Sequence, residues 1–107
     1  MKEAMAAYNE AVRRDPQSAW AYNHRGNVYR RLGRYHLAIR DYNQAIRLAP
    51  QFAESYAGRA FAYTLLSRGN EAQQDVARAV ELGFESALLE REIEELTKRR
   101  QLHGEKE

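Results

Sequence analysis

Residues 22–50 read YNHRGNVYRRLGRYHLAIRDYNQAIRLAP and end on a proline, as the segment AVRRDP does 34 residues earlier. A shift of the whole sequence by 34 residues superimposes similar side chains along most of the chain. The matched pairs include Tyr22 with Tyr56, Arg25 with Arg59, Tyr29 with Tyr63, Leu32 with Leu66, Ala38 with Ala72 and Ala45 with Ala79. In the other direction, the shift superimposes Ala4, Tyr8, Ala11, Val12 and Pro16 on Ala38, Tyr42, Ala45, Ile46 and Pro50. An internal period of this length predicts about two and a half stacked helical units.

Within each unit, the recurring residues have the spacing of helix faces. The first face carries Tyr22, Arg25, Gly26, Tyr29 and Leu32, and the second carries Ala38, Tyr42, Ala45 and Ile46. Gly33 follows the first face and Pro50 the second, and both residue types end helices. We therefore expect helices near residues 2–14, 19–32, 35–48, 53–66, 70–82 and 86–102, without strands. The expected fold class is all-α, a right-handed superhelical solenoid of antiparallel helix hairpins.

The same residues resemble the signature of the tetratricopeptide repeat (TPR) family in order and spacing. The matching positions are Tyr22, Gly26, Tyr29, Ala38, Tyr42, Ala45 and Pro50. The second repeat departs from the signature, with Ala60 in place of the glycine, Val76 in place of the aromatic residue and Gly83 and Phe84 in place of the proline. The resemblance implies a single TPR domain over residues 1–107. It comprises the second helix of a partial repeat (1–16), two full repeats (17–50 and 51–84), and a capping helix with its tail (85–107).

The C-terminal segment ESALLEREIEELTKRRQLHGEKE does not continue the signature. Leu89, Ile93 and Leu96 still form an apolar stripe, and its outer face is charged. Glu94 and Lys98 have the i, i+4 spacing of helical ion pairs, as do Glu95 and Arg99. This pattern is typical of a helix that caps a solenoid. A basic membrane-binding helix is the weaker interpretation, because seven acidic residues accompany five lysines and arginines from residue 85 onward.

The resemblance also implies a binding surface. In the family, the first helices of the hairpins line a concave groove that receives peptides or helices of other proteins. The groove positions carried over to this chain include Trp20, Asn23, His24, Asn27 and Arg30 from the first repeat and Phe61 from the second. Carboxamides can donate to and accept from an extended backbone, while Ala57 and Gly58 would leave space for an apolar side chain. We therefore expect an extended peptide that combines an apolar side chain with an acidic group, which Arg30 would bind.

Two alternatives for these groove positions remain open at this point. The asparagines could simply tolerate solvent, and Trp20 could pack on a neighbouring helix. One ligand class of the family fits the sequence poorly, namely the C-terminal carboxylate of heat-shock chaperones. The repeats that clamp it carry lysine, asparagine and asparagine where this chain has Asn23, Asn27 and Gly58, and lysine and arginine where it has Leu88 and Glu92. Only Asn27 agrees, so we do not expect this clamp.

Composition argues against catalysis, cofactors and membranes. The chain has no cysteine, a net charge of +2 and 44% apolar residues, and it has neither an apolar run of about 18 residues nor a signal-peptide core. The default location is therefore cytoplasmic. His24, His36 and His103 lack the mutual spacing of metal ligands, and neither a nucleophile elbow nor a glycine-rich phosphate loop is present. We expect no enzymatic activity, no cofactor and no metal.

Two further functions are weaker alternatives. Between the two prolines, six arginines accompany a single acid, Asp41. Without aromatic residues interleaved for base stacking, such a surface would bind nucleic acid nonspecifically at best. The other alternative is self-association, because the N-terminal helix lacks the first helix of its repeat. Its apolar face, formed by Ala4, Met5, Tyr8, Ala11 and Val12, would then mediate a homodimer.

Overall fold

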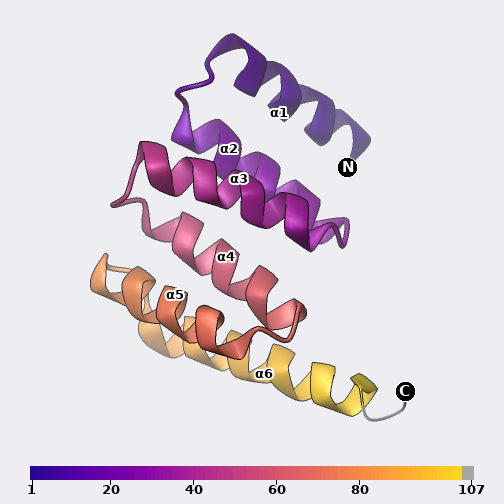
Figure 1. The fold of residues 1–107 in the computed structure, drawn as a ribbon, viewed down its shortest axis with the longest axis vertical. Coiled ribbons are helices and arrows are strands. Elements are labelled where there is room, and N and C mark those ends of the chain that lie inside the picture. Colours follow the sequence, from indigo (N-terminus) through magenta and orange to yellow (C-terminus); the bar gives the residue numbers. More distant parts are fainter. Residues whose placement is uncertain (105–107) are drawn as a thin grey trace.

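The computed structural model describes residues 1–104 and contains six helices over this range, with no strand. They are α1 (Lys2–Arg14), α2 (Ala19–Arg31), α3 (Tyr35–Leu48), α4 (Ala53–Leu65), α5 (Gly69–Glu81) and α6 (Ser86–Gly104). The helices are stacked along the long axis of the molecule, with α1 at one end and α6 at the other (Figure 1). The expected all-helical solenoid is confirmed, and every helix bound lies within two residues of its expected position. Residues 105–107 of the predicted tail lie outside the described range.

The turns inside the two hairpins are equivalent and require a left-handed residue. Gly33 has φ 77° between α2 and α3, and Ser67 has φ 60° one period later, between α4 and α5. In each turn, the amide of the next residue donates to a carbonyl of the preceding helix, Tyr29 at 2.9 Å and Tyr63 at 2.8 Å. Glycine adopts this conformation without strain, whereas serine does so at a cost. Ser67 also contacts α6, because its Oγ accepts a hydrogen bond from Nη2 of Arg100 at 3.0 Å.

Tyr42 of α3 forms the centre of the packing between α2 and α4. Its side chain is fully buried. A Cβ atom added to Gly26 would lie 2.9 Å from the ring, and one added to Gly58 would lie 2.6 Å from it. Both glycines are therefore needed for close approach of the ring. The expectation that Gly58 and Ala57 leave space for a ligand side chain is wrong, because the tyrosine ring fills the space at Gly58 and Ala57 is itself buried.

A repeated ion pair fastens the two helices of each hairpin. Arg25 of α2 makes a bidentate contact with Asp41 of α3 at 2.7 and 2.8 Å, and Arg59 of α4 makes the same contact with Asp75 of α5 at 2.8 Å for both bonds. Each guanidinium also donates to an asparagine of the preceding helix. These asparagines are Asn9, at 3.2 Å, and Asn43, at 2.7 Å. Bidentate pairs of this kind are the stronger, geometrically specific ones, and the hydrogen bond to Asp41 raises the pKa of Arg25. The charge of Arg25 is thus neutralised within the fold.

The last helix closes the core at the C-terminal end. Leu89 and Ile93 of α6 are buried against Tyr56, Val76 and neighbouring alanines of α4 and α5. The α6 helix packs more extensively on α4 than on α5. Leu89 and Ile93 of the expected apolar stripe are thus buried, Leu96 is half-buried, and the expected ion pair between Glu94 and Lys98 is present at 3.2 Å. None of the helices over residues 1–104 is long and apolar enough to cross a membrane.

Candidate functional site

The groove positions expected from the sequence lie on α2 and α4, but their environments differ. Trp20 is exposed, with 54% of its surface accessible, whereas Asn23 is buried at 2%. The remaining four positions are half-buried, namely His24, Asn27, Arg30 and Phe61. A half-buried side chain is held in place by its neighbours and still has surface available to a ligand.

Three aromatic side chains gather where α1 meets the start of α2. Tyr8 contacts Trp20 edge-on, with ring centroids 5.7 Å apart, and stacks on His24 at 5.6 Å. Trp20 and His24 lie 4.4 Å apart. This aromatic cluster of Tyr8, Trp20 and His24 includes one residue, Tyr8, that was not predicted as part of the groove. The 34-residue period was the available signal, since it relates Tyr8 and His24 to Tyr42 and Gly58, which also pack on each other.

The hydroxyl of Tyr42 organises the C-terminal half of α2. It donates to Oδ1 of Asn27 at 2.5 Å and accepts from Nε of Arg30 at 3.2 Å. Burial raises the pKa of Tyr42, against the opposing effect of the Arg30 charge, so the hydroxyl stays neutral and able to donate. The Arg30 guanidinium also lies over the ring of Phe61, 5.2 Å from its centroid. These contacts fix Asn27 and Arg30 in place and leave the Asn27 amide and the terminal nitrogens of Arg30 for other partners.

Asn23 takes part in the packing between helices. Its Oδ1 accepts a hydrogen bond at 3.0 Å from Oγ of Ser55, which is itself buried. The residue therefore joins α2 to α4, so its carboxamide oxygen is already used within the fold. Ser55 was not a candidate in the sequence, because the contact joins residues 32 positions apart on two different helices.

A pocket of about 320 Å³ lies where α2, α4 and α6 converge. Its lining comprises Arg30, Phe61, Glu92, Glu95, Leu96 and Arg99. This groove pocket thus joins two of the predicted residues, Arg30 and Phe61, with four from α6. None of these four was predicted from the sequence as a groove residue, and Glu92 was considered only as a departure from the chaperone clamp. The period was again a usable signal, because Glu92 and Glu95 stand one period after Gly58 and Phe61.

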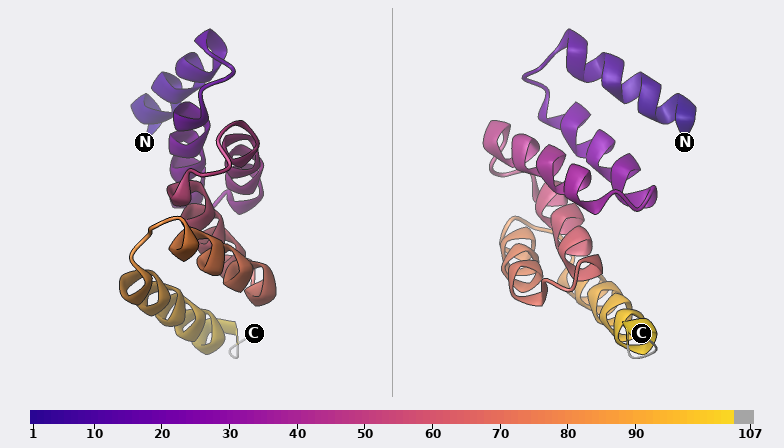
Figure 2. Two further views of the ribbon diagram at one scale, coloured as in Figure 1. Left: turned by 90° about the vertical axis from the view of Figure 1, so that its left-hand side faces the viewer. Right: turned by 45° about the vertical axis from the view of Figure 1, so that its right-hand side comes forward.

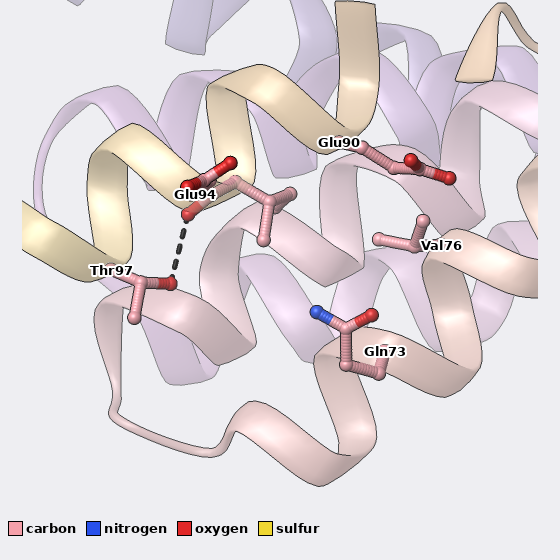
Figure 3. Close-up of a pocket in the computed structure, with 6 residues that line it drawn as sticks. Gln73, Val76, Glu90, Glu94 and Thr97 are labelled. Carbon is pink, nitrogen blue, oxygen red and sulfur yellow. Dashed lines mark hydrogen bonds between the residues drawn. The ribbon is translucent and has the colours of Figure 1, made fainter. Parts of the chain in front are cut away.

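A second pocket, of about 350 Å³, opens between α5 and α6. It is lined by Gln73, Val76, Glu90, Ile93, Glu94 and Thr97, and Figure 3 shows the side chains of α5 and α6 facing one another. Thr97 donates to the backbone oxygen of Ile93 at 2.8 Å. This α5–α6 pocket contains none of the predicted groove residues.

Comparison with known proteins gives a consistent result. The family model of the tetratricopeptide repeat matches residues 19–52, and a second family model, of the TPR repeat, matches residues 1–33. Among solved structures, the second TPR of Spaghetti (RPAP3) bound to the HSP90 peptide SRMEEVD is 30% identical, with a TM-score of 0.73, over 76% of this chain and 75% of that chain. The first TPR of the same protein, bound to the same peptide, is 26% identical, with a TM-score of 0.82, over 92% of this chain and 78% of that one.

The TPR2B domain of yeast Sti1, in a complex with pHsp70, is 27% identical to this chain. Its TM-score is 0.76, and the match covers 94% of this chain and 82% of that one. No curated protein matches the chain.

Proposed function

Because the chain belongs to the tetratricopeptide repeat family, we propose that it is a protein-interaction module that binds a peptide or helix of a partner protein in its groove. The observation that carries this proposal is the groove pocket, where Phe61 and Leu96 supply apolar surface beside Arg30. Arg30 has no carboxylate partner among residues 1–104. A concave site that combines apolar walls with a few fixed polar groups is typical of ligand recognition.

The groove fits an extended peptide with an acidic residue and an apolar one. The terminal nitrogens of Arg30 would donate to the acid in a charge-assisted hydrogen bond, and the Asn27 amide would donate to the peptide backbone. The aromatic cluster would bind the apolar side chain. Trp20 and Arg30 are ten residues apart on one helix, which is a rise of about 15 Å, and an extended peptide covers about 15 Å with four or five residues. We therefore expect the apolar and acidic residues of the ligand to be separated by about that number.

The test is selection from a displayed library of random heptapeptides, followed by fluorescence anisotropy with the enriched peptide. Asn27→Ala should weaken binding by about 1 to 3 kcal/mol with little dependence on salt, whereas Arg30→Ala should flatten the salt dependence of the affinity. The control variants are Arg40→Ala and Arg47→Ala, at exposed positions of α3, and they should bind as the wild type does. If these α3 variants lose affinity while both groove variants keep it, the ligand binds the outer surface and the proposal is wrong.

Self-association through α1 is a second candidate. None of the residues of α1 is fully buried, and its only extensive packing within the described chain is against α2. A second copy that covered the apolar face around Tyr8 would remove this surface from water. Sedimentation equilibrium should then show a mass that rises with concentration, and Tyr8→Glu should lower it. Ala6→Glu, which adds the same charge at an exposed position, is the matched control, and a strict monomer at high concentration would rule the dimer out.

A further inference from the structure

The groove pocket contains four charged side chains with no ion-pair partner over residues 1–104. These are Arg30, Glu92, Glu95 and Arg99. The sequence predicted an i, i+4 pair between Glu95 and Arg99, yet the structure pairs only the neighbouring Glu94 with Lys98 among the described α6 residues. The wall that α6 contributes is therefore able to form ion pairs with a ligand.

Both carboxylates of the pocket come from α6, which also contributes Arg99, while Arg30 comes from α2. Glu92 and Glu95 stand three positions apart on α6, so they lie on the same side of that helix and repel each other. Arg30 comes from α2 and is held by Tyr42 and Phe61. A cation placed at the two carboxylates would relieve their repulsion, and an anion placed at Arg30 would complete its hydrogen bonds. Leu96 and Phe61 supply the apolar surface of the same pocket.

We propose that the groove pocket selects a peptide segment in which an acidic and a basic side chain stand next to each other beside an apolar one. The acid contacts Arg30 and the base contacts Glu92 and Glu95. A second apolar side chain, distinct from the one that the aromatic cluster binds, packs against Phe61 and Leu96. This inference rests on the proposed function and adds the charge pattern of the ligand. A peptide with two adjacent acidic side chains at these positions, such as the glutamates of the SRMEEVD bound by the two Spaghetti domains, places like charge against the α6 carboxylates and binds more weakly.

Three labelled, C-terminally amidated peptides test the charge pattern by fluorescence anisotropy at low salt. They are SRMEEVD, SRMEKVD, in which one glutamate is replaced by lysine, and SRMKKVD. An exposed ion pair changes an equilibrium constant by about fivefold at most. SRMEKVD should therefore bind about two- to fivefold more tightly than either of the others. The double variant Glu92→Lys with Glu95→Lys should reverse the order of SRMEKVD and SRMEEVD.

The matched control is Glu90→Lys with Glu94→Lys, which makes the same change of charge on the same helix. Both glutamates line the α5–α6 pocket and not the groove pocket (Figure 3), so this variant should keep the wild-type order of the three peptides. If the Glu92 and Glu95 variant also keeps that order, the charge pattern is wrong.

Amide chemical shifts of the 15N-labelled protein separate this failure from failure of the groove itself. If the peptides shift α2, α4 and α6 resonances and Arg30→Ala weakens the binding of all three peptides, but the expected order of affinities is absent, the proposed peptide-binding function is supported and the charge pattern is overturned. If no peptide shifts those resonances at millimolar concentration, both proposals are overturned.

Discussion

Tyr8 and Tyr42 occupy equivalent positions one period apart, yet their environments differ. Tyr42 is fully enclosed between Gly26 and Gly58, and its hydroxyl makes two hydrogen bonds. Tyr8 is half-buried and stacks on His24, which stands where the next repeat has Gly58. Figure 2 shows the cause, since α3 lies among other helices while α1 lies at the end of the stack. The same residue in the same register is thus fully buried between two helices and only half-buried at the end of the stack.

The largest difference should appear when each ring is removed. Tyr42→Ala takes away a fully buried aromatic side chain and should destabilise the protein by about 3 to 5 kcal/mol. Tyr8→Ala loses a half-exposed ring and should cost no more than about 1 kcal/mol. Urea unfolding followed by circular dichroism measures both. Equal losses would mean that the end of the solenoid is packed as tightly as its middle.

A smaller effect is expected from the residues that the two rings touch. Gly58→Ala places a Cβ atom about 2.6 Å from the Tyr42 ring, and overpacking of this kind costs about 1 to 3 kcal/mol. His24→Ala, at the equivalent position, removes a stacking partner and should cost less than about 1 kcal/mol. Thermal unfolding of the two variants gives the comparison. If Gly58→Ala is as stable as the wild type, the ring has room to move and the close packing is not required.

The helices and their order could be predicted because they depend on local spacing. Gly33 and Pro50 mark helix ends in the sequence itself, and the 34-residue period carries that information along the chain. The face of α2 that carries Trp20 and Arg30 follows from the same spacing. What the face does was harder to predict, because burial depends on neighbouring helices. Asn23 sits on the predicted face, yet its oxygen is bound to Ser55 on α4.

Two features were visible in the sequence but needed the structure to be understood. Arg25 and Asp41 are separated by 16 residues, as are Arg59 and Asp75, so the ion pair repeats with the period. In the sequence, Arg25 was counted among the arginines of a candidate basic surface, whereas in the structure its charge is paired with Asp41. The α6 residues that line the groove pocket could not be predicted for a different reason. The TPR signature does not extend beyond the second repeat, but α6 still packs where the first helix of a further repeat would lie.

The smallest effect concerns the Tyr42 hydroxyl alone. Tyr42→Phe keeps the ring and removes its hydrogen bonds to Asn27 and Arg30, which should cost about 1 kcal/mol at neutral pH. Burial raises the pKa of Tyr42 above that of an unfolded tyrosine, which is about 10. The unfolded chain therefore loses this proton first as the pH rises, and the contribution of the hydroxyl to stability is complete below pH of about 10 and lost above it. Phenylalanine does not ionise, so the stability gap between wild type and Tyr42→Phe should narrow above that pH in urea titrations.

Tyr8→Phe removes a hydroxyl that makes no hydrogen bond within residues 1–104 and should follow the wild type at neutral pH. If the stability gap stays constant up to pH of about 11, the pKa of Tyr42 is the same in the folded and unfolded chains, and the prediction is wrong.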